Sequence, residues 1–146
     1  MSDFRSLSAE VSASPQIDTS DVATAQERGF AMIVNNRPDG EVEGQPTGAE
    51  IERAAEEAGL AYRHIPISHG NFGPAEVAAM EQALADAGGP VLAYCRTGTR
   101  STLLWSLVQA RQGRPLADIV DEAAAAGYDI SPVMSAMQAY SSSKPG

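Results

Sequence analysis

The sequence predicts an α/β domain in which a mostly parallel central sheet of four or five strands carries helices on both faces. Two short apolar runs, at 30–34 and 90–94, are typical of strands that a parallel sheet buries. Segments with a helical spacing of apolar residues alternate with these runs, and only helical patterns follow residue 102. This alternation indicates a parallel sheet between helices. At 146 residues the chain fits a single domain, 1–146, with its core at about 4–140.

The N-terminal segment predicts an edge strand, a helix and a buried strand. Residues 4–12 alternate loosely between apolar and polar, as an edge strand does. Residues 18–21, Asp-Thr-Ser-Asp, offer N-caps for a helix that runs to about Arg28. Gly29 then suits the position that follows a helix, just before the buried strand at 30–34.

A second helix and a further strand follow in the middle of the chain. Thr47 suits the N-cap of the helix, and Glu50 lies three residues later, as in a capping box. The face of this helix is given by Ile51, Ala54, Ala55 and Ala58. A strand is expected at 61–67 and a loop at 68–73, after which Pro74 suits the first turn of a third helix. The buried stripe of the third helix is Val77, Met80 and Leu84.

The C-terminal part of the chain predicts helices alone. The apolar run at 102–108 predicts a buried helix. The next helix has an apolar face made of Leu116, Ile119, Val120, Ala123 and Ala124, and it ends at Gly127. A final amphipathic helix is marked by Val133, Met134, Met137 and Tyr140. Residues 141–146 are expected to be a frayed, disordered end.

The stretch from 90 to 101, P-V-L-A-Y-C-R-T-G-T-R-S, predicts a site because it places a tight loop between a buried strand and a helix. The backbone N–H groups of such a loop point inward, and the helix dipole adds positive charge, so the loop binds anions. Cys95 at its rim would be stabilised as a thiolate, a nucleophile at neutral pH. Arg100, which is expected to close the loop, offers a planar fork to an oxyanion.

The other residues of this loop have supporting roles in the same interpretation. Gly98 allows the backbone to turn where a side chain would block the pocket. The backbone amides of Arg96, Thr97, Gly98, Thr99 and Arg100 would surround the anion. Ser101 either donates a hydrogen bond to the sulfur or caps the first turn of the helix.

Composition excludes several other classes of function. A formal net charge of −9 argues against binding to nucleic acid or to anionic membrane surfaces. No apolar run approaches the ~20 residues of a membrane span, and the N-terminus lacks the apolar core of a signal peptide. One cysteine allows no internal disulfide, which fits a cytoplasmic protein and leaves no resolving thiol. Two histidines with one distant cysteine make no metal-ligand pattern, and no cofactor is expected.

The loop C-x-x-G-x-R-S resembles the active-site loops of two groups of cysteine enzymes. Rhodanese-type sulfurtransferases have four residues between Cys and Arg, whereas protein tyrosine and dual-specificity phosphatases have five and then Ser or Thr. Here Cys95 and Arg100 enclose four residues, and Ser101 follows the arginine.

Over about residues 4–130 the chain resembles a bacterial family, the phosphatase-like domain of beta-lactamase-hydrolase-like proteins. This resemblance rests on the Cys95 loop, on F-R-S-L-S-A-E-V at the start, on V-N-N-R-P-D-G-E at 34–41 and on Y-R-H-I-P-I at 62–67. It implies the fold of tyrosine/dual-specificity phosphatases. The chemistry attributed to the family includes both phosphatase-like hydrolysis and sulfur transfer.

Three loops are expected to converge, because ligands of an open parallel sheet bind beyond the carboxyl ends of its strands. They are 35–43, 68–73 and 95–100. In the first loop, Arg37 either helps to hold an anion or is a surface arginine paired with Asp39.

The histidines and acids decide which chemistry such a site supports. His69 either donates a proton or is a solvent-facing loop residue, whereas His64, inside a strand, is expected to be structural. A phosphatase needs a general acid, usually an Asp on the loop upstream of the cysteine. The loop at 68–73 contains neither Asp nor Glu, so only Asp39 or His69 remains for that role.

The sequence therefore favours sulfur transfer over phosphate-ester hydrolysis. The departing sulfite or thiol is already a stable anion, so no proton donor is required, and a loop one residue shorter leaves less room for a phosphate. We expect a sulfurtransferase that forms a persulfide on Cys95 and passes the sulfur to an external thiol acceptor. A phosphatase with a Cys95 phosphoenzyme and a non-catalytic module that binds phosphorylated or persulfidated partners are the alternatives. The substrate is a small anion, either a sulfane sulfur compound or a phosphate ester.

Overall fold

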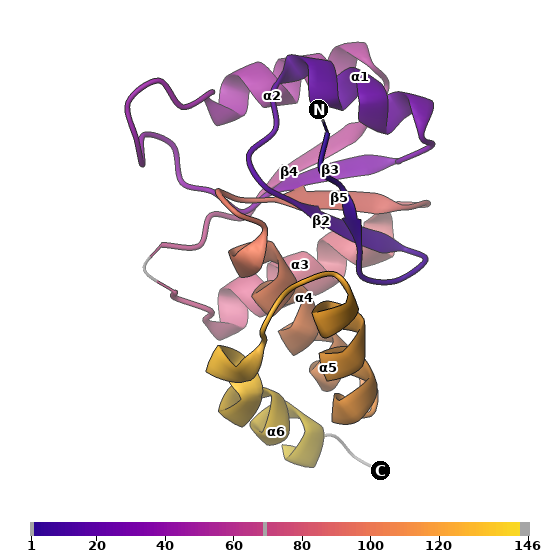
Figure 1. Cartoon of the computed structure of the whole chain (residues 1–146), viewed down its shortest axis with the longest axis vertical. Coiled ribbons are helices and arrows are strands. Elements are labelled where there is room, and N and C mark those ends of the chain that lie inside the picture. The colour runs from indigo at the N-terminus through magenta and orange to yellow at the C-terminus, as the bar shows by residue number, and fades with distance from the viewer. Residues whose placement is uncertain (1, 69, 144–146) are drawn as a thin grey trace.

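A twisted, mostly parallel sheet lies at the centre of the protein (Figure 1). The computed structural model describes residues 2–68 and 70–143. Within these residues the sheet has five strands in the order β1-β2-β5-β3-β4. The strands are β1 (Arg5–Ser6), β2 (Val11–Ser14), β3 (Met32–Asn35), β4 (Ala61–His64) and β5 (Val91–Tyr94). Only the short β1 is antiparallel to its neighbour.

The register of the sheet brings the carboxyl ends of four strands to one edge. Tyr94 at the end of β5 lies opposite Ser14 of β2 and Asn35 of β3. Asn35 in turn lies opposite His64, the last residue of β4. The segments that follow β3, β4 and β5 therefore leave the sheet on the same side, at the left of Figure 1.

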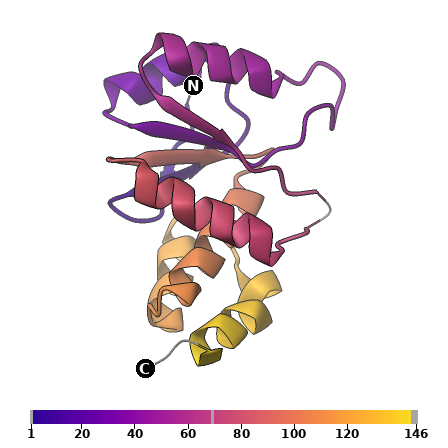
Figure 2. The same cartoon turned by 180° about the vertical axis from the view of Figure 1, so that it is seen from behind.

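Helices cover both faces of the sheet, as the front and back views show (Figures 1 and 2). On one face lie α1 (Thr19–Glu27) and α2 (Gly48–Glu57). The other face carries α3 (Pro74–Asp86) and α4 (Thr99–Arg111), and α4 in turn contacts α5 (Leu116–Ala125) and α6 (Met134–Ser143). A 3-10 turn, η1 (Ser131–Val133), precedes α6. The predicted fold class is thus confirmed.

The alternation of side chains along each strand divides the core into two clusters. Ile33 and Leu92 pack with the helices of one face, whereas Val34 and Ala93 pack with those of the other. The second cluster is the larger, because α4 lies between the sheet and the C-terminal helices and is buried along most of its length. Trp105 at its middle has no exposed surface. The helix that begins beside Cys95 is therefore fixed by the core.

Local side-chain caps fix the starts of two helices, α1 and α2. The Asp18 side chain accepts a hydrogen bond from the Asp21 amide, and the Asp21 carboxylate accepts one from the Asp18 amide, which is the reciprocal pair of a capping box. Thr47 caps α2 by accepting from the Glu50 amide. These helices begin where the sequence predicts because their first N–H groups are satisfied within a few residues.

Two of the predicted strands differ from those observed. The expected strand at 4–12 is a hairpin instead: the chain turns at Ser8, whose hydroxyl accepts from the Val11 amide, and returns as β2. The expected strand at 61–67 ends at His64. Pro66, which lacks an N–H group, interrupts regular pairing there, although Ile65 and Ile67 still donate to the carbonyls of residues 35 and 36.

The helix after the cysteine loop and the C-terminal segment also differ from prediction. We expected a helix at 102–108, but α4 begins at Thr99, so Arg100 and Ser101 lie in its first turn and do not close the loop. The predicted frayed end from 141 is wrong for its first three residues, because α6 continues through Ser143. Residues 144–146 lie outside the described part of the chain.

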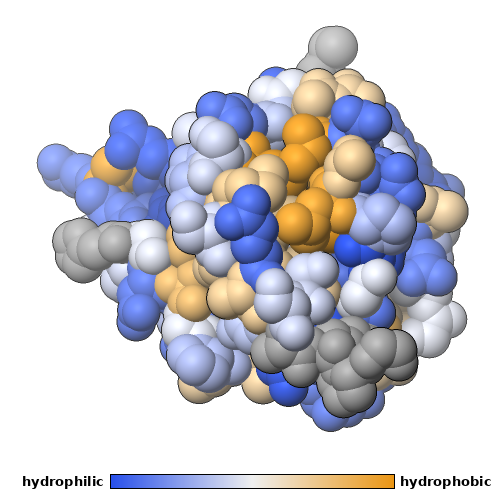
Figure 3. Space-filling model, turned by 90° about the horizontal axis from the view of Figure 1, so that it is seen from below, coloured by the Kyte–Doolittle hydropathy of each residue, from blue (hydrophilic) through white to orange (hydrophobic). Residues whose placement is uncertain are grey.

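The end of the molecule that carries α5 and α6 exposes apolar side chains bordered by polar ones (Figure 3). A cleft beside α5 is lined in part by Val120, Tyr128, Ile130 and Met134. Among the described residues, none of the helices combines the length and the apolarity that crossing a bilayer requires.

Candidate active site

A polar cleft of about 440 Å³ opens at the edge of the sheet where the strands end. Its walls come from three segments: the residues after β3, the residue Ser68 after β4, and the loop and first helical turn after β5. The lining residues are Pro38, Asp39, Gly40, Glu41, Ser68, Arg96 and Arg100. The three loops that the sequence predicts to converge do so, in the part that the structure describes.

Backbone hydrogen bonds fix the loop from Cys95 to Gly98 against its neighbours. The Cys95 amide donates to the Ser14 carbonyl at 3.3 Å, and the Gln16 amide donates to the Arg96 carbonyl at 3.2 Å. Gly98 is the N-cap of α4 and has a φ of 92°, a left-handed conformation that favours glycine. The Thr102 amide then closes the first turn of the helix on the Gly98 carbonyl.

The sulfur of Cys95 lies inside this loop. The Gly98 amide donates to Sγ at 3.1 Å, and the helix begins directly behind it. Cys95 has no exposed surface, so the prediction that it sits at the rim of the pocket is wrong. The reason is that β5 lies between β2 and β3 in the sheet, and the segments that follow these two strands are hydrogen-bonded to the end of β5 and its loop.

The other loop amides are less uniformly directed than the sequence suggested. The Thr99 amide donates to the hydroxyl of Thr97 at 3.3 Å, which turns it to a local partner. Arg96 is one of the residues that line the cleft. Gly98 is the amide that reaches the sulfur.

Arg100 projects from the first turn of α4 across the cleft. Its Nη1 donates to Glu41 Oε2 and to the Ile67 carbonyl, and its Nη2 donates to Glu41 Oε1, each at 2.8 Å. These three bonds leave the Nε–H and one Nη2–H, which lie on the same edge of the guanidinium, for other partners. The hydrogen bond that Arg100 donates to Glu41 is the largest cause that raises the pKa of Arg100, against the effect of burial.

Glu41 lies in a loop that the sequence places at the site, but the sequence analysis assigned it no role. Its carboxylate accepts from Arg100 through both oxygens and from Arg37 Nε at 2.8 Å. The Arg100 hydrogen bond is the largest cause that lowers the pKa of Glu41 to about 2. Glu41 is therefore ionised at neutral pH and holds no proton to donate.

Arg37 has neither of the two roles that we expected for it. It does not pair with Asp39 at the surface, and it is not exposed to an incoming anion, because only 4% of its side chain is accessible. Its Nε donates to Glu41 and its Nη1 donates to Gln16 Oε1 at 3.0 Å, while the buried Nη2 has no hydrogen-bond partner among the described residues. Arg37 thus lies behind Glu41 and holds its carboxylate.

Of the remaining residues that the sequence analysis considered, Asp39 lies at the cleft, and the two histidines were expected to have different roles. Asp39 lines the cleft, but its Oδ1 accepts from the Gly48 amide at 2.8 Å, at the N-terminus of α2. His69 lies outside the described residues. His64 contacts the Arg37 carbonyl through Nε2 at 3.1 Å.

A buried polar bridge connects α4 to the end of β3. Ser101 donates from its hydroxyl to Asn36 Oδ1 at 2.7 Å, and Asn36 Nδ2 donates to the Ile65 carbonyl at 3.0 Å. Both predicted roles of Ser101 are therefore wrong: its one hydroxyl proton is used for Asn36, and α4 has no side-chain cap. Asn36 was also missed, although a polar residue directly after a buried strand is a signal for such a bridge.

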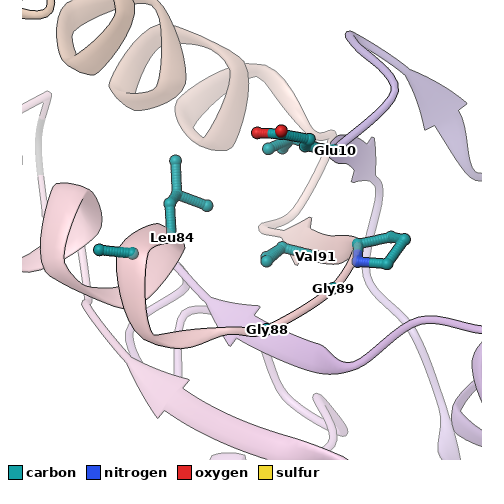
Figure 4. Close-up of a pocket in the computed structure, with 8 residues that line it drawn as sticks. Glu10, Leu84, Gly88, Gly89 and Val91 are labelled. Atoms are coloured by element: carbon teal, nitrogen blue, oxygen red, sulfur yellow. The ribbon is translucent and has the colours of Figure 1, made fainter.

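A second pocket lies at the opposite edge of the sheet and takes no part in this site. It is formed where β5 begins, between α3 and the turn before β2, with Glu10, Leu84 and Val91 around it (Figure 4). Because β2 and β5 are parallel, their amino ends are at this edge and the cysteine loop is at the other. Among the described residues, no group of His, Cys, Asp and Glu comes together that could hold a metal ion.

The fold and this site define a class: a phosphatase-like α/β domain with a cysteine loop at the start of a helix. The chain belongs to the family of the phosphatase-like domain of beta-lactamase hydrolase-like proteins, whose pattern it matches over residues 3–112. A beta-lactamase hydrolase-like protein of Agrobacterium fabrum is 40% identical over 111 residues, which are 75% of this chain and 26% of the relative. One from Xylella fastidiosa is 36% identical over 118 residues, 80% of this chain and 27% of the relative. The chain thus spans about a quarter of the length of these curated relatives.

Solved structures agree with this assignment. A candidate phosphatase from Neisseria meningitidis has a TM-score of 0.82 and 34% identity, over 93% of this chain and 96% of its own. The active form of Tk-PTP has a TM-score of 0.72 at 18% identity, over 97% of this chain and 98% of its own, which shows a shared fold. The expected resemblance to tyrosine phosphatase-like proteins is confirmed.

Proposed function

We propose that the protein is a cysteine-dependent sulfurtransferase that carries sulfane sulfur as a persulfide on Cys95. The observation that supports this function is the state of the acids in the cleft. Glu41 is ionised between two arginines, with a pKa of about 2, and Asp39 is hydrogen-bonded to a helix N-terminus. Among the described residues the site thus offers cations for an anion but no acid ready to donate a proton, which suits a reaction whose leaving group needs no proton.

The two half-reactions conserve charge without a general acid. The Cys95 thiolate attacks the outer sulfur of thiosulfate, a new S–S bond forms, and sulfite leaves with the electrons of the S–S bond that breaks. The thiolate of an external acceptor then attacks the outer sulfur of the persulfide and regenerates the Cys95 thiolate. The four-residue spacing between Cys95 and Arg100 is also that of the rhodanese-type loop.

Each part of the site has a role in this reaction. The Gly98 amide and the N-terminus of α4 stabilise the negative sulfur, because both direct positive charge at it. The edge of Arg100 that Glu41 does not occupy binds the sulfonate of the donor. Because Cys95 has no exposed surface, the loops over the cleft must move apart before a donor reaches the sulfur.

A phosphatase is the second candidate, and three observations favour it. A structure 34% identical over nearly the whole chain is described as a candidate phosphatase, and TpbA of Pseudomonas aeruginosa, which has this fold at 20% identity, was solved with phosphotyrosine. In addition, Asp39 lines the cleft and could protonate a leaving alkoxide if it released the Gly48 amide. In that case Cys95 would form a phosphoenzyme.

The intact mass of the protein after incubation with thiosulfate or glutathione persulfide tests the proposal. Sulfur transfer predicts an adduct of one sulfur atom, which a thiol acceptor removes. Cys95→Ser provides the control and should form no adduct, since Cys95 is the only cysteine.

The same preparations distinguish the alternatives. Hydrolysis of an aryl phosphate with inhibition by vanadate, but no sulfur adduct, would replace the proposal with the phosphatase. Binding of phosphorylated or persulfidated ligands that Cys95→Ser retains, without turnover in either assay, would indicate a binding module.

A further inference from the structure

A tyrosine from the C-terminal helices contacts the cysteine loop from behind. Tyr128 follows α5, belongs to the larger core cluster and is 7% exposed. Its hydroxyl donates to the carbonyl of Thr97 at 3.2 Å. It also fills the space beside Gly98, so that any side chain at Gly98 would collide with this hydroxyl. The ring and the loop are therefore packed directly together.

The Thr97 carbonyl and the Gly98 amide belong to one peptide group, which connects Tyr128 to the sulfur. In a planar trans peptide the C=O and N–H bonds point in opposite directions. The Tyr128 hydroxyl donates to the oxygen of this peptide, and the nitrogen of the same peptide donates to Cys95 Sγ at 3.1 Å. We propose that Tyr128 is a positioning residue that fixes the Thr97–Gly98 peptide with its N–H directed at the Cys95 sulfur.

Such a peptide needs to be held because glycine permits it to rotate. Gly98 has a φ of 92°, and a glycine can exchange left-handed for other conformations at little cost. Rotation of the peptide would direct the Thr97 carbonyl dipole at the sulfur and would remove the hydrogen bond of the amide. The hydroxyl of Tyr128 opposes this rotation because it binds the carbonyl on the far side. It also polarises the peptide, which strengthens the N–H as a donor.

Tyr128 itself is held as a neutral donor. Burial is the largest cause that raises the pKa of Tyr128, so the phenol keeps its proton at neutral pH. The Arg5 guanidinium lies over the ring, 5.2 Å from its centroid, and Arg5 Nη1 donates to the Ala126 carbonyl at 3.4 Å. The edge strand β1, which begins at Arg5, thereby contacts the tyrosine.

The test measures the pH at which the Cys95 sulfur loses its proton. The rate of Cys95 alkylation by iodoacetamide is followed from pH 5 to pH 10 in the full chain and in Tyr128→Phe, which keeps the ring and loses only the hydroxyl. We expect the midpoint of the profile to rise by about half a pH unit, so that the alkylation rate at a pH well below the midpoint falls about threefold. Tyr62→Phe is the matched control, since the hydroxyl of Tyr62 is also partly buried but is bonded to Asn35 on β3, not to the Thr97–Gly98 peptide. The control profile should coincide with that of the wild type.

An unchanged midpoint in folded Tyr128→Phe would overturn the inference. If circular dichroism shows that this variant is unfolded, Arg5→Gln decides instead: a smaller rise supports the inference, and no rise overturns it. The inference rests on the proposed thiolate chemistry of Cys95, but the readout does not depend on turnover. The two proposals can therefore fail separately. If the midpoint shifts in Tyr128→Phe but the wild type forms no persulfide, Tyr128 remains the positioning residue and the sulfurtransferase function is rejected.

Discussion

The loop around Cys95 and the segment between β3 and α2 face each other across one cleft, but they are stabilised differently. Backbone bonds hold the Cys95 loop, from the Cys95 amide to Ser14 and from the Gln16 amide to Arg96. Side chains hold the other segment, chiefly through Glu41 between its two arginines. Most substitutions at the loop surface should therefore be tolerated. A change of one member of the charged cluster of Arg37, Glu41 and Arg100 should instead lower activity or stability.

Arg100 should show the largest effect, because it is the member of the charged cluster that faces the substrate. Arg100→Lys keeps the charge but cannot bind both Glu41 oxygens and the Ile67 carbonyl while presenting an edge to an anion. We expect kcat/KM for sulfur transfer to fall about a hundredfold, measured with thiosulfate and a thiol acceptor. Arg111→Lys, at the other end of α4 and paired with Glu81, is the control and should remain active. Equal losses in both variants would exclude a specific role for Arg100.

Glu41→Gln should have the next largest effect and should act through Arg100. The amide keeps one acceptor but loses the charge that fixes two guanidinium groups, one of them buried. We expect kcat/KM to fall about tenfold through misorientation of Arg100. The free energy of unfolding should fall by about 2 kcal/mol because Arg37 loses its charged partner. A gain in donor affinity would instead show that Glu41 competes with the substrate anion.

The same variant gives a test at low pH. The pKa of Glu41 is lowered from 4.5 to about 2 by Arg100 first and Arg37 next. A depressed pKa stabilises the fold fully above the unfolded value, and this stabilisation is lost as the pH falls from 4.5 toward 2. Urea unfolding at pH 7 and pH 3 should therefore show a larger loss for the wild type than for Glu41→Gln. Equal losses of unfolding free energy in the two proteins would show that the Glu41 ion pairs do not stabilise the fold.

The same contrast explains what the sequence could predict. The Cys95 loop was predictable because nucleophile, glycine and arginine are contiguous, and the helix caps at Asp18 and Thr47 were predictable for the same local reason. The start of α4 was not, because its N-cap, Gly98, has no side chain to signal it. Glu41 was not predictable as a partner of Arg100, since the pair spans 59 residues of sequence. Nothing in the sequence indicates that Tyr128 would reach the loop from the C-terminal helices.

Ser101→Ala should affect stability and leave the sulfur unchanged. The variant leaves Asn36 Oδ1 buried without the donor it has now, which should cost about 1–2 kcal/mol in urea unfolding. The alkylation profile of Cys95 should keep its midpoint, because the hydroxyl proton is directed at Asn36. A raised midpoint would restore the sulfur as a partner of Ser101.

Thr97→Ala should have the smallest effect and should separate backbone from side chain within the loop itself. The exposed hydroxyl of Thr97 is bonded to Thr99, the first residue of α4, whereas the Thr97 carbonyl accepts the bond from Tyr128. Removal of the hydroxyl should change the free energy of unfolding by no more than about 0.5 kcal/mol. The alkylation midpoint of Cys95 should not move, because the peptide that reaches the sulfur is intact. A shift as large as that in Tyr128→Phe would mean that side chains, and not the peptide group, control the sulfur.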